Sequence, residues 1–193
     1  MRLKNKIAII TGAGSGFGKG IAIRFAEEEA KVVIVDINLD SAEKVAMEIG
    51  KNALAVKCDV SQDGDVAYLF EQTLEQFGSA DILVNNAGTT HRNKPMTEVT
   101  EKEFDQIFAV NVKSVFLTAK HGVPLMKKQG QGVILNVAST AGQRPRPGLT
   151  WYNTSKGAMI SATKAMAIEL ATFKIRVNAI NPVAGETGML NLF

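Results

Sequence analysis

Short runs of β-branched and other apolar residues alternate with longer segments of helical character along the whole chain. Several of these runs are apolar almost without interruption, which is typical of strands buried on both faces of a parallel sheet. The expected strands are Ile7–Thr11, Lys31–Asp36, Ala53–Asp59, Asp81–Asn85, Gly132–Ala138 and Ile175–Ile180. The expected helices are Gly16–Glu28, Leu39–Ile49, Gln62–Phe77, Glu101–Lys128 and Trp151–Phe173. This alternation predicts βαβ units with right-handed crossovers, and therefore an α/β fold with a doubly wound parallel sheet of six strands.

Composition narrows the class of protein. The 193 residues fit a single domain, 1–193, and 46% hydrophobic with 21% charged residues is ordinary for a soluble globular chain. A net charge of +3 without a basic block argues against a nucleic-acid partner, and no apolar run approaches the ~20 residues of a membrane span. The lone Cys58 excludes an internal disulfide, and no cluster has metal-ligand spacing. We expect a cytoplasmic protein with no metal and no membrane partner.

A glycine-rich turn follows the first expected strand. Gly12, Gly16 and Gly18 are spaced Gly-x3-Gly-x-Gly and lead directly into the first expected helix. Glycines allow a tight turn and close approach of a diphosphate, which the positive end of the helix would stabilise. The spacing differs from the common Gly-x-Gly-x-x-Gly pattern, and a plain flexible turn is the alternative. Between a strand and a helix, however, the turn favours phosphate binding.

Asp36 ends the second expected strand, where a carboxylate can accept hydrogen bonds from the ribose hydroxyls of an adenosine. The same charge would repel a 2′-phosphate, and neither Ser15 nor Ile37 supplies the basic residue that such a phosphate needs. NAD is therefore favoured over NADP as cofactor. The alternative is that Asp36 caps the helix that opens near Leu39.

Polar residues also follow the third and fourth expected strands, at the edge where open α/β sheets bind ligands. Asp59 could accept a hydrogen bond from an adenine amino group or could cap the helix near Gln62. In the run Asn85–Gly88 the two asparagines could stabilise a turn, while Gly88 would permit close approach of a cofactor. The carboxyl edge of the sheet is thus the expected cofactor site.

Ser139, Tyr152 and Lys156 form the candidate catalytic group. Tyr152 and Lys156 are four residues apart in a helix and therefore share a face, and a loop with Pro145 and Pro147 can bring Ser139 back to them. A neighbouring ammonium is expected to lower the pKa of the phenol from its usual value near ~10. The serine hydroxyl could hold the oxygen of a reacting carbonyl or alcohol. These groups predict general acid–base chemistry on a carbonyl/alcohol pair.

These residues stand in the order and spacing of a known family. The chain resembles the short-chain dehydrogenases/reductases over essentially all of its length. The resemblance rests on Thr11-Gly12-x3-Gly16-x-Gly18, Asp59, Asn85-Asn86-Ala87-Gly88, Asn111, Ser139 and Tyr152-x3-Lys156. It implies a Rossmann-like fold, a nicotinamide cofactor and an oxidoreductase that interconverts a secondary alcohol and a ketone.

The resemblance also implies individual roles. Tyr152 would be the general acid/base, Ser139 would orient the substrate, Lys156 would hold the nicotinamide ribose, and Asn111 would anchor a water that relays protons to Lys156. Residues expected to bind the cofactor are Gly12, Ser15, Gly16, Phe17, Gly18, Asp36, Ile37, Asp59, Val60, Asn86, Ala87, Gly88, Tyr152, Lys156, Pro182 and Thr187.

The chain departs from the family pattern at three points. Val183 follows Pro182 where the family usually has glycine, and Glu29 stands where a helix commonly ends on a left-handed glycine, which predicts mild backbone strain. Family members also continue into a substrate-covering lobe and a seventh strand. The chain is therefore expected to be truncated at its C-terminus, and to lack both.

The substrate class stays open at the level of the sequence. Pocket-wall candidates are Thr89, Thr90, His91, Arg92, Ala141, Gly142, Gln143, Arg144, Thr150 and Trp151. Arg92, Arg144 and Arg146 could bind an anionic substrate or could simply be solvated, and His91 could contact substrate or lie on the surface. One alternative function is a 3-oxoacyl-acyl-carrier-protein reductase, although Ile168 stands where those enzymes generally carry arginine. Another is a non-catalytic dinucleotide-binding regulator.

An oligomer is the expected state. The segment 151–173 is apolar nearly all round, which predicts a helix that is buried on all sides. The resemblance implies that this helix and the helix at 101–128 pair with their copies in a homodimer, often within a homotetramer.

Overall fold

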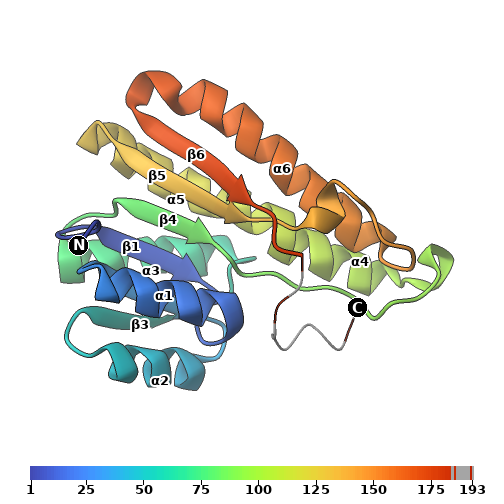
Figure 1. Cartoon of the computed structure of the whole chain (residues 1–193), viewed down its shortest axis with the longest axis horizontal. Coiled ribbons are helices and arrows are strands. Elements are labelled where there is room, and N and C mark those ends of the chain that lie inside the picture. Colours follow the sequence, from blue (N-terminus) through green and yellow to red (C-terminus); the bar gives the residue numbers. More distant parts are fainter. Residues whose placement is uncertain (184, 186–191, 193) are drawn as a thin grey trace.

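The computed structural model describes residues 1–183, 185 and 192, and its core is a parallel six-stranded sheet (Figure 1). The strands are β1 (Ile7–Thr11), β2 (Lys31–Asp36), β3 (Ala53–Lys57), β4 (Ile82–Asn85), β5 (Gly132–Val137) and β6 (Ile175–Ile180). Their order is β3-β2-β1-β4-β5-β6, and every neighbouring pair is parallel. The predicted Rossmann-like α/β fold is confirmed, and the predicted strands differ from the observed ones only at their ends.

Helices cover both faces of the sheet (Figure 1). The α-helices are α1 (Gly16–Glu27), α2 (Leu39–Ile49), α3 (Asp63–Phe77), α4 (Glu101–Phe108), α5 (Ser114–Gln129) and α6 (Thr150–Leu170). Shorter turns are η1 (Met96–Glu98), η2 (Ala109–Lys113), η3 (Thr140–Gly142) and η4 (Ala171–Phe173). Helices α1 and α2 pack on one face, while α3, α5 and α6 pack on the other.

The two faces follow from the alternation of side chains along each strand. Ile9 of β1 pairs with Val33 of β2, and both point into the core beneath α3 and α5. Ile10 and Ile34, one residue further along, point into the core beneath α1 and α2. Because both faces are apolar, these strands are continuous hydrophobic runs in the sequence.

The predicted helix at 101–128 is interrupted. It divides into α4, a π-helical turn (η2) at Ala109–Lys113, and α5. Thr100 and Glu103 form a reciprocal capping box that begins α4, and Gly130, with φ +72°, ends α5. The π-helical turn places the buried Asn111 between the two helices.

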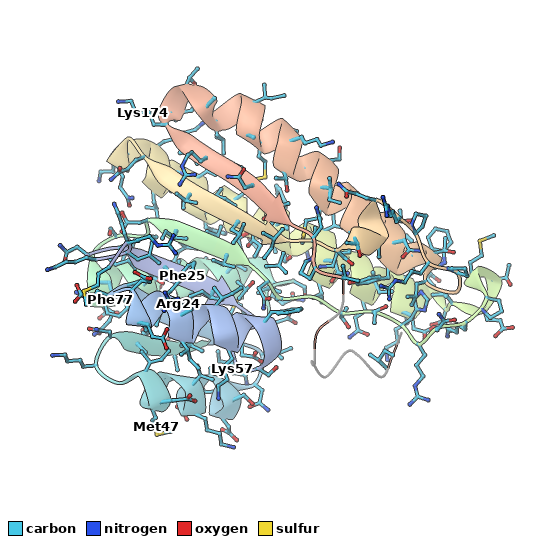
Figure 2. All side chains as sticks on the ribbon, viewed as in Figure 1. Arg24, Phe25, Met47, Lys57, Phe77 and Lys174 are labelled. Carbon is cyan, nitrogen blue, oxygen red and sulfur yellow. The ribbon has the colours of Figure 1, made fainter. Side chains whose placement is uncertain are left out.

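Two reversals between a helix and a strand lack the usual glycine. Glu29 follows α1 with φ +66°, and Lys174 precedes β6 with φ +57° (Figure 2). Non-glycine residues adopt this left-handed conformation at a cost. The strain predicted at Glu29 is confirmed.

The prediction that the helix at 151–173 is buried on all sides is wrong for a single chain. Ile168 on α6 is 80% exposed, and Phe116 on α5 is 63% exposed. Only one side of α6 packs on β5, β6 and η3, so its other apolar side faces outward. In the described part of the chain, no helix combines the length and apolar character that crossing a membrane requires.

Candidate active site

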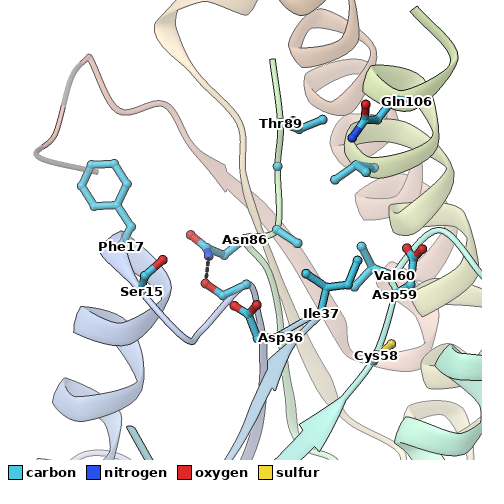
Figure 3. A pocket seen from close by; sticks show the side chains of 15 residues that line it. Ser15, Phe17, Asp36, Ile37, Cys58, Asp59, Val60, Asn86, Thr89 and Gln106 are labelled. Carbon is cyan, nitrogen blue, oxygen red and sulfur yellow. Dashed lines mark hydrogen bonds between the residues drawn. The ribbon is translucent and has the colours of Figure 1, made fainter. Parts of the chain in front are cut away.

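A cleft of about 390 Å³ opens at the carboxyl edge of the sheet (Figure 3). It lies where the chain order reverses between β1 and β4, the position at which open α/β sheets bind ligands. The lining residues are Gly12, Ser15, Gly16, Phe17, Asp36, Ile37, Cys58, Asp59, Val60, Asn86, Ala87, Gly88, Thr89, Gln106 and Val110.

The floor of the cleft is built from backbone that leaves no space for side chains. Gly12 has φ +63°, and a Cβ there would lie 2.9 Å from the Cα of Ala87. Gly18 lies behind the cleft, where a Cβ would clash with the carbonyl oxygen of Gly12. The Asn86 amide nitrogen donates to the carbonyl oxygen of Gly12 at 3.0 Å (Figure 3). It also donates to the carbonyl oxygen of Thr11 at 2.8 Å, and the two bonds lock the turn to the end of β4. The glycine turn therefore fits a diphosphate lying against the start of α1.

Asp36 lies in the wall of the cleft next to the exposed Ile37. Its carboxylate accepts from the backbone N–H groups of Gly14 and Asn38, each at 3.0 Å. Asn38, not Asp36, caps α2, because the Asn38 side chain accepts from the Ser41 N–H. The helix-cap alternative for Asp36 is wrong, and its carboxylate faces the cleft in a fixed orientation.

Asp59 and Val60 line the cleft at the end of β3. Oδ1 of Asp59 accepts from both the backbone N–H and the hydroxyl of Ser61, so it orders the turn that precedes α3. The helix itself begins after Gln62, which makes no side-chain cap. Asp59 therefore does not cap the helix, and it presents its carboxylate beside the cleft.

Ser139, Tyr152 and Lys156 come together as predicted and are all buried. The Ser139 hydroxyl is hydrogen-bonded to the Tyr152 phenol, and the Lys156 ammonium lies 5.9 Å from the centre of the tyrosine ring. Nζ of Lys156 donates to the Val137 carbonyl oxygen at 2.9 Å. The loop folds back as expected, because Gly142 in η3 packs so closely on α6 that a Cβ would lie 2.7 Å from the Lys156 carbonyl carbon.

The expected lowering of the phenol pKa is not observed. Burial raises the pKa of Tyr152, and the hydrogen bond from Ser139 and the charge of Arg146 offset only part of that effect. Burial also lowers the pKa of the Lys156 ammonium to about 8. Removing the two groups from water disfavours the charged form of each. The site therefore holds a neutral phenol beside an ammonium whose pKa lies closer to neutral pH than that of an ordinary lysine.

Asn111 anchors the loop that follows β4. Its side-chain oxygen accepts from the Thr89 N–H at 2.8 Å, and its amide nitrogen donates to the Thr89 carbonyl oxygen and to the Ser155 hydroxyl, each at 2.9 Å. Gly88 fits between this amide and Lys156, since a Cβ there would lie 3.3 Å from the lysine Nζ. Asn111 thus connects the cofactor loop to the helix that carries Tyr152 and Lys156.

Some expected cofactor residues lie outside the cleft. Pro182 is at the end of β6, where its carbonyl oxygen accepts from the N–H and hydroxyl of Thr140. Thr187 falls outside the described residues. Gln106 and Val110 line the cleft but were not predicted. Their spacing of four residues on the helical segment that leads to Asn111 is the signal that could have identified them.

Among the candidate substrate residues, the three arginines are exposed and His91 is buried. Arg92, Arg144 and Arg146 are exposed, and Arg146 donates to the Val183 carbonyl oxygen at 3.3 Å. His91 is only 4% exposed, so the alternative of a surface histidine is wrong. The Trp151 indole donates to the Met96 carbonyl oxygen and packs edge-on against Phe104, which fixes the start of α6.

Comparison with known proteins identifies the class. The family model of the short chain dehydrogenases matches residues 6–192. The 4-formylbenzenesulfonate dehydrogenase of Comamonas testosteroni is 48% identical over 193 residues, covering 98% of this chain and 77% of that protein. The chain is an oxidoreductase that belongs to the short-chain dehydrogenase family.

Solved structures agree with this assignment. A 3-ketoacyl-(acyl-carrier-protein) reductase from Brucella melitensis, complexed with NADH, superposes with a TM-score of 0.98 at 54% identity and covers 99% of this chain and 81% of that one. An NAD+-bound xylitol dehydrogenase superposes with a TM-score of 0.91 at 33% identity, covering 95% and 72%. Both relatives hold NAD in its reduced or oxidised form.

Proposed function

We propose that this protein is an NAD-dependent dehydrogenase that interconverts a secondary alcohol and a ketone, with Tyr152 as the general acid/base. The observation that carries the proposal is the buried group of Ser139, Tyr152 and Lys156 next to a glycine-walled cleft. Residues 1–193 would form one domain that contains both the cofactor site and the catalytic residues.

The cleft suits NAD better than NADP. The diphosphate would lie on the glycine turn at Gly12 and Gly16, and Asp36 would accept hydrogen bonds from the adenosine ribose. Asp36 is held in place by two backbone N–H groups, so it cannot turn away from a 2′-phosphate. NAD, when bound, supplies the acceptor for the hydride that leaves the alcohol carbon. Both NAD-bound relatives support this choice.

The proton is handled by the chain's own residues. The Ser139 hydroxyl holds the substrate oxygen next to Tyr152, and the phenolate of Tyr152 accepts the alcohol proton. Because burial disfavours the phenolate, the positive charge of Lys156 is needed to stabilise it as it forms. Lys156 is held by the Val137 carbonyl oxygen and is therefore well placed to act on the phenol and on the cofactor ribose near Gly88.

The test combines turnover with binding. Purified protein is given NAD and a panel of secondary alcohols, and reduced nicotinamide is followed by its absorbance. Tyr152→Phe should lower kcat by about 10²–10⁴-fold while leaving the Kd for NAD unchanged, because only the proton acceptor is lost. Thr154→Ala is the control, because it changes an exposed residue two positions after Tyr152 on α6, and it should retain activity. Activity retained by Tyr152→Phe would remove Tyr152 from this role.

A 3-oxoacyl-acyl-carrier-protein reductase is the second candidate, favoured by the 54% identity to the Brucella melitensis enzyme. Against it, Ile168 offers an exposed apolar side chain where docking of an acidic carrier would be helped by a cation. Reduction of an acetoacetyl carrier protein with NADH, compared with oxidation of the alcohol panel, separates the two activities. A non-catalytic regulator is disfavoured because a pure binder has no use for Tyr152 and Lys156 together.

We also propose a homodimer or homotetramer that pairs α5 and α6 with their copies. The exposed Phe116 and Ile168 lie on these helices, and such large apolar side chains are typical of an interface when they cluster. Light scattering coupled to size-exclusion chromatography should give twice or four times the 20.7 kDa of one chain. Ile168→Asp should shift that mass towards the monomer.

A further inference from the structure

His91 is a buried histidine with one ring nitrogen in a hydrogen bond and the other without a partner among the described residues. Nδ1 lies 2.7 Å from the carbonyl oxygen of Arg92, and a carbonyl oxygen can only accept, so Nδ1 carries the hydrogen. In the neutral ring, Nε2 is then an acceptor. Nε2 is buried and has no hydrogen-bond partner among the residues that the structure describes. A buried acceptor without a donor is costly, so this arrangement is suited to a donor supplied by a ligand.

The histidine lines a second cavity of about 290 Å³, with Thr90 and Glu103 also in its wall. Thr89 and Gln106 line both this cavity and the dinucleotide cleft, so the two spaces adjoin. The Thr89 backbone is fixed by Asn111 and follows Gly88, which faces Lys156. A molecule in this cavity would therefore lie next to the proposed reaction centre.

Two other ionised groups lie in the wall, Glu103 and the exposed Arg92, and of these Glu103 is already satisfied. The Glu103 carboxylate accepts from the Lys94 ammonium and from the Thr100 N–H and hydroxyl, and these contacts lower the pKa of Glu103 to about 2. Lys94 is in turn neutralised by Glu103, so this pair attracts no anion into the cavity, and Arg92 is the cation of the wall that forms no ion pair with the described residues. Among the described residues of this wall, the buried polar atom without a hydrogen-bond partner is an acceptor, the Nε2 of His91.

We propose that Nε2 of His91 accepts a hydrogen bond from a substrate hydroxyl other than the one that is oxidised, which makes the substrate a polyhydroxylated alcohol. This inference rests on the proposed dehydrogenase function. A neutral imidazole with its Nδ1 hydrogen committed matches an O–H donor and offers nothing to a carboxylate or sulfonate. His91 is then a specificity-determining residue, separate from the Ser139–Tyr152–Lys156 group.

Two isosteric variants separate the ring nitrogens. His91→Asn keeps a donor near the position of Nδ1 and removes Nε2, whereas His91→Gln places an amide near the position of Nε2 and loses the bond to Arg92. The probes are the pentitols xylitol and arabitol, compared with 2-pentanol, which has the same number of carbons and no additional hydroxyl. His91→Asn should raise the KM for a pentitol roughly five- to tenfold, leave its kcat within about twofold, and leave both constants for 2-pentanol unchanged. His91→Gln should retain most of the preference for the pentitol.

The outcomes distinguish this inference from the proposed function. His121→Asn changes the chain's other histidine, on α5, and should leave all constants unchanged. Wild-type protein that oxidises 2-pentanol as efficiently as any pentitol, or a His91→Asn variant that loses both substrates equally, would overturn the role of His91. No turnover of any alcohol with NAD would instead reject the proposed function.

A measurement without turnover tests the same atom. The sequence has two histidines, so long-range proton–nitrogen spectra of protein with isotope-labelled histidine nitrogens show two imidazole rings. The spectrum of His121→Asn assigns them. We expect His91 to be neutral with hydrogen on Nδ1, and the Nε2 resonance to shift when a pentitol is added with NAD. A ring protonated on both nitrogens at pH 7, or an Nε2 resonance unmoved by saturating pentitol, would overturn the inference.

Discussion

Nδ2 of Asn85 donates to Oδ1 of Asn136 at 2.9 Å, and both side chains are buried between neighbouring strands. The Thr118 hydroxyl donates to Oδ1 of Asn85, and Nδ2 of Asn136 donates to the Thr163 hydroxyl, at 2.9 Å and 2.8 Å. These four residues form a polar network that links β4, β5, α5 and α6 inside an otherwise apolar core. In such a setting each unmade hydrogen bond is costly, so the network fixes how the four elements lie against one another.

The network lies beneath the candidate active site. Ser139 follows Asn136 by three residues along the chain, and Gly88 follows Asn85 by three. Asn111 and Lys156 each precede the threonine of their own helical segment by seven residues, about two turns. The network thus lies on elements that carry the candidate catalytic residues or lead directly into them, which couples the stability of the core to the geometry of the site.

Asn136→Ala should therefore destabilise the fold. It leaves the buried amide of Asn85 without its acceptor and removes the donor to Thr163, so we expect a loss of about 3 kcal/mol in the free energy of unfolding. Chemical denaturation measures this loss. The matched control is Asn178→Ala, which changes an exposed asparagine on β6 and should cost less than about 0.5 kcal/mol. Equal effects of the two substitutions would contradict a special role for the network.

Asp36→Asn should weaken discrimination between the two nicotinamide cofactors. The amide keeps one acceptor but loses the negative charge, so affinity for NAD should fall about tenfold while affinity for NADP rises. Isothermal titration calorimetry with each cofactor gives the two dissociation constants. Asp40→Asn, a change of the exposed carboxylate in the first turn of α2, is the control. Unchanged affinity for both cofactors in Asp36→Asn would place the ribose elsewhere.

Lys156 should make the protein more stable at alkaline pH. Its pKa is about 8 in the folded state and 10.5 as an ordinary lysine, so between these values the unfolded chain binds a proton that the folded chain does not. The free energy of unfolding should then rise with pH from about 8 to 10.5, by up to about 1.4 kcal/mol per pH unit from this group. The contribution of Lys156 is isolated by subtracting the free energy of unfolding of Lys156→Met at each pH. A difference that does not change across this window would show that burial does not lower the pKa of Lys156.

Glu29→Gly should stabilise the protein. At φ +66° glycine avoids the steric penalty that glutamate carries, and we expect a gain of about 0.5–1 kcal/mol by thermal or chemical denaturation. Glu29 also pairs with Lys4 at 3.9 Å on the surface, so Glu29→Ala serves as the control that removes the pair and keeps the strain. A glycine variant no more stable than the alanine variant would argue against strain at this position.

The sequence predicted the fold well because the relevant signals are local. Apolar runs marked each strand, and the glycine turn, Asp36 and Asp59 each fell at the end of a strand whose position was therefore known. The π-helical turn could not be predicted in the same way, since Ala109–Lys113 is an ordinary helical sequence and only the packing of Asn111 against Thr89 and Ser155 favours the wider turn. Asn111 was therefore predicted as a site residue from the family resemblance alone.

Properties that depend on burial were predicted less well. The pKa of Tyr152 depends on how much water surrounds the phenol, and residue spacing says only that Lys156 is near. For His91, the sequence was equally consistent with a contact to substrate and with a position on the surface. The structure shows that the ring is buried. In both cases the information that the sequence lacks is the solvent exposure of the side chain.

The π-helical turn at Ala109–Lys113 also restricts how this chain can change in length. A π-turn holds one residue more than the same stretch of α-helix. Losing one residue there would let the segment close into regular helix while α5 keeps its orientation, so Leu117 and Met126 would stay in the core. Losing one residue early in α5, which has no such extra residue, would rotate the helix beyond that point by about 100° and turn Met126 away from the sheet. Two adjoining parts of one helical segment therefore differ in their tolerance of deletions, although nothing in their composition marks the difference.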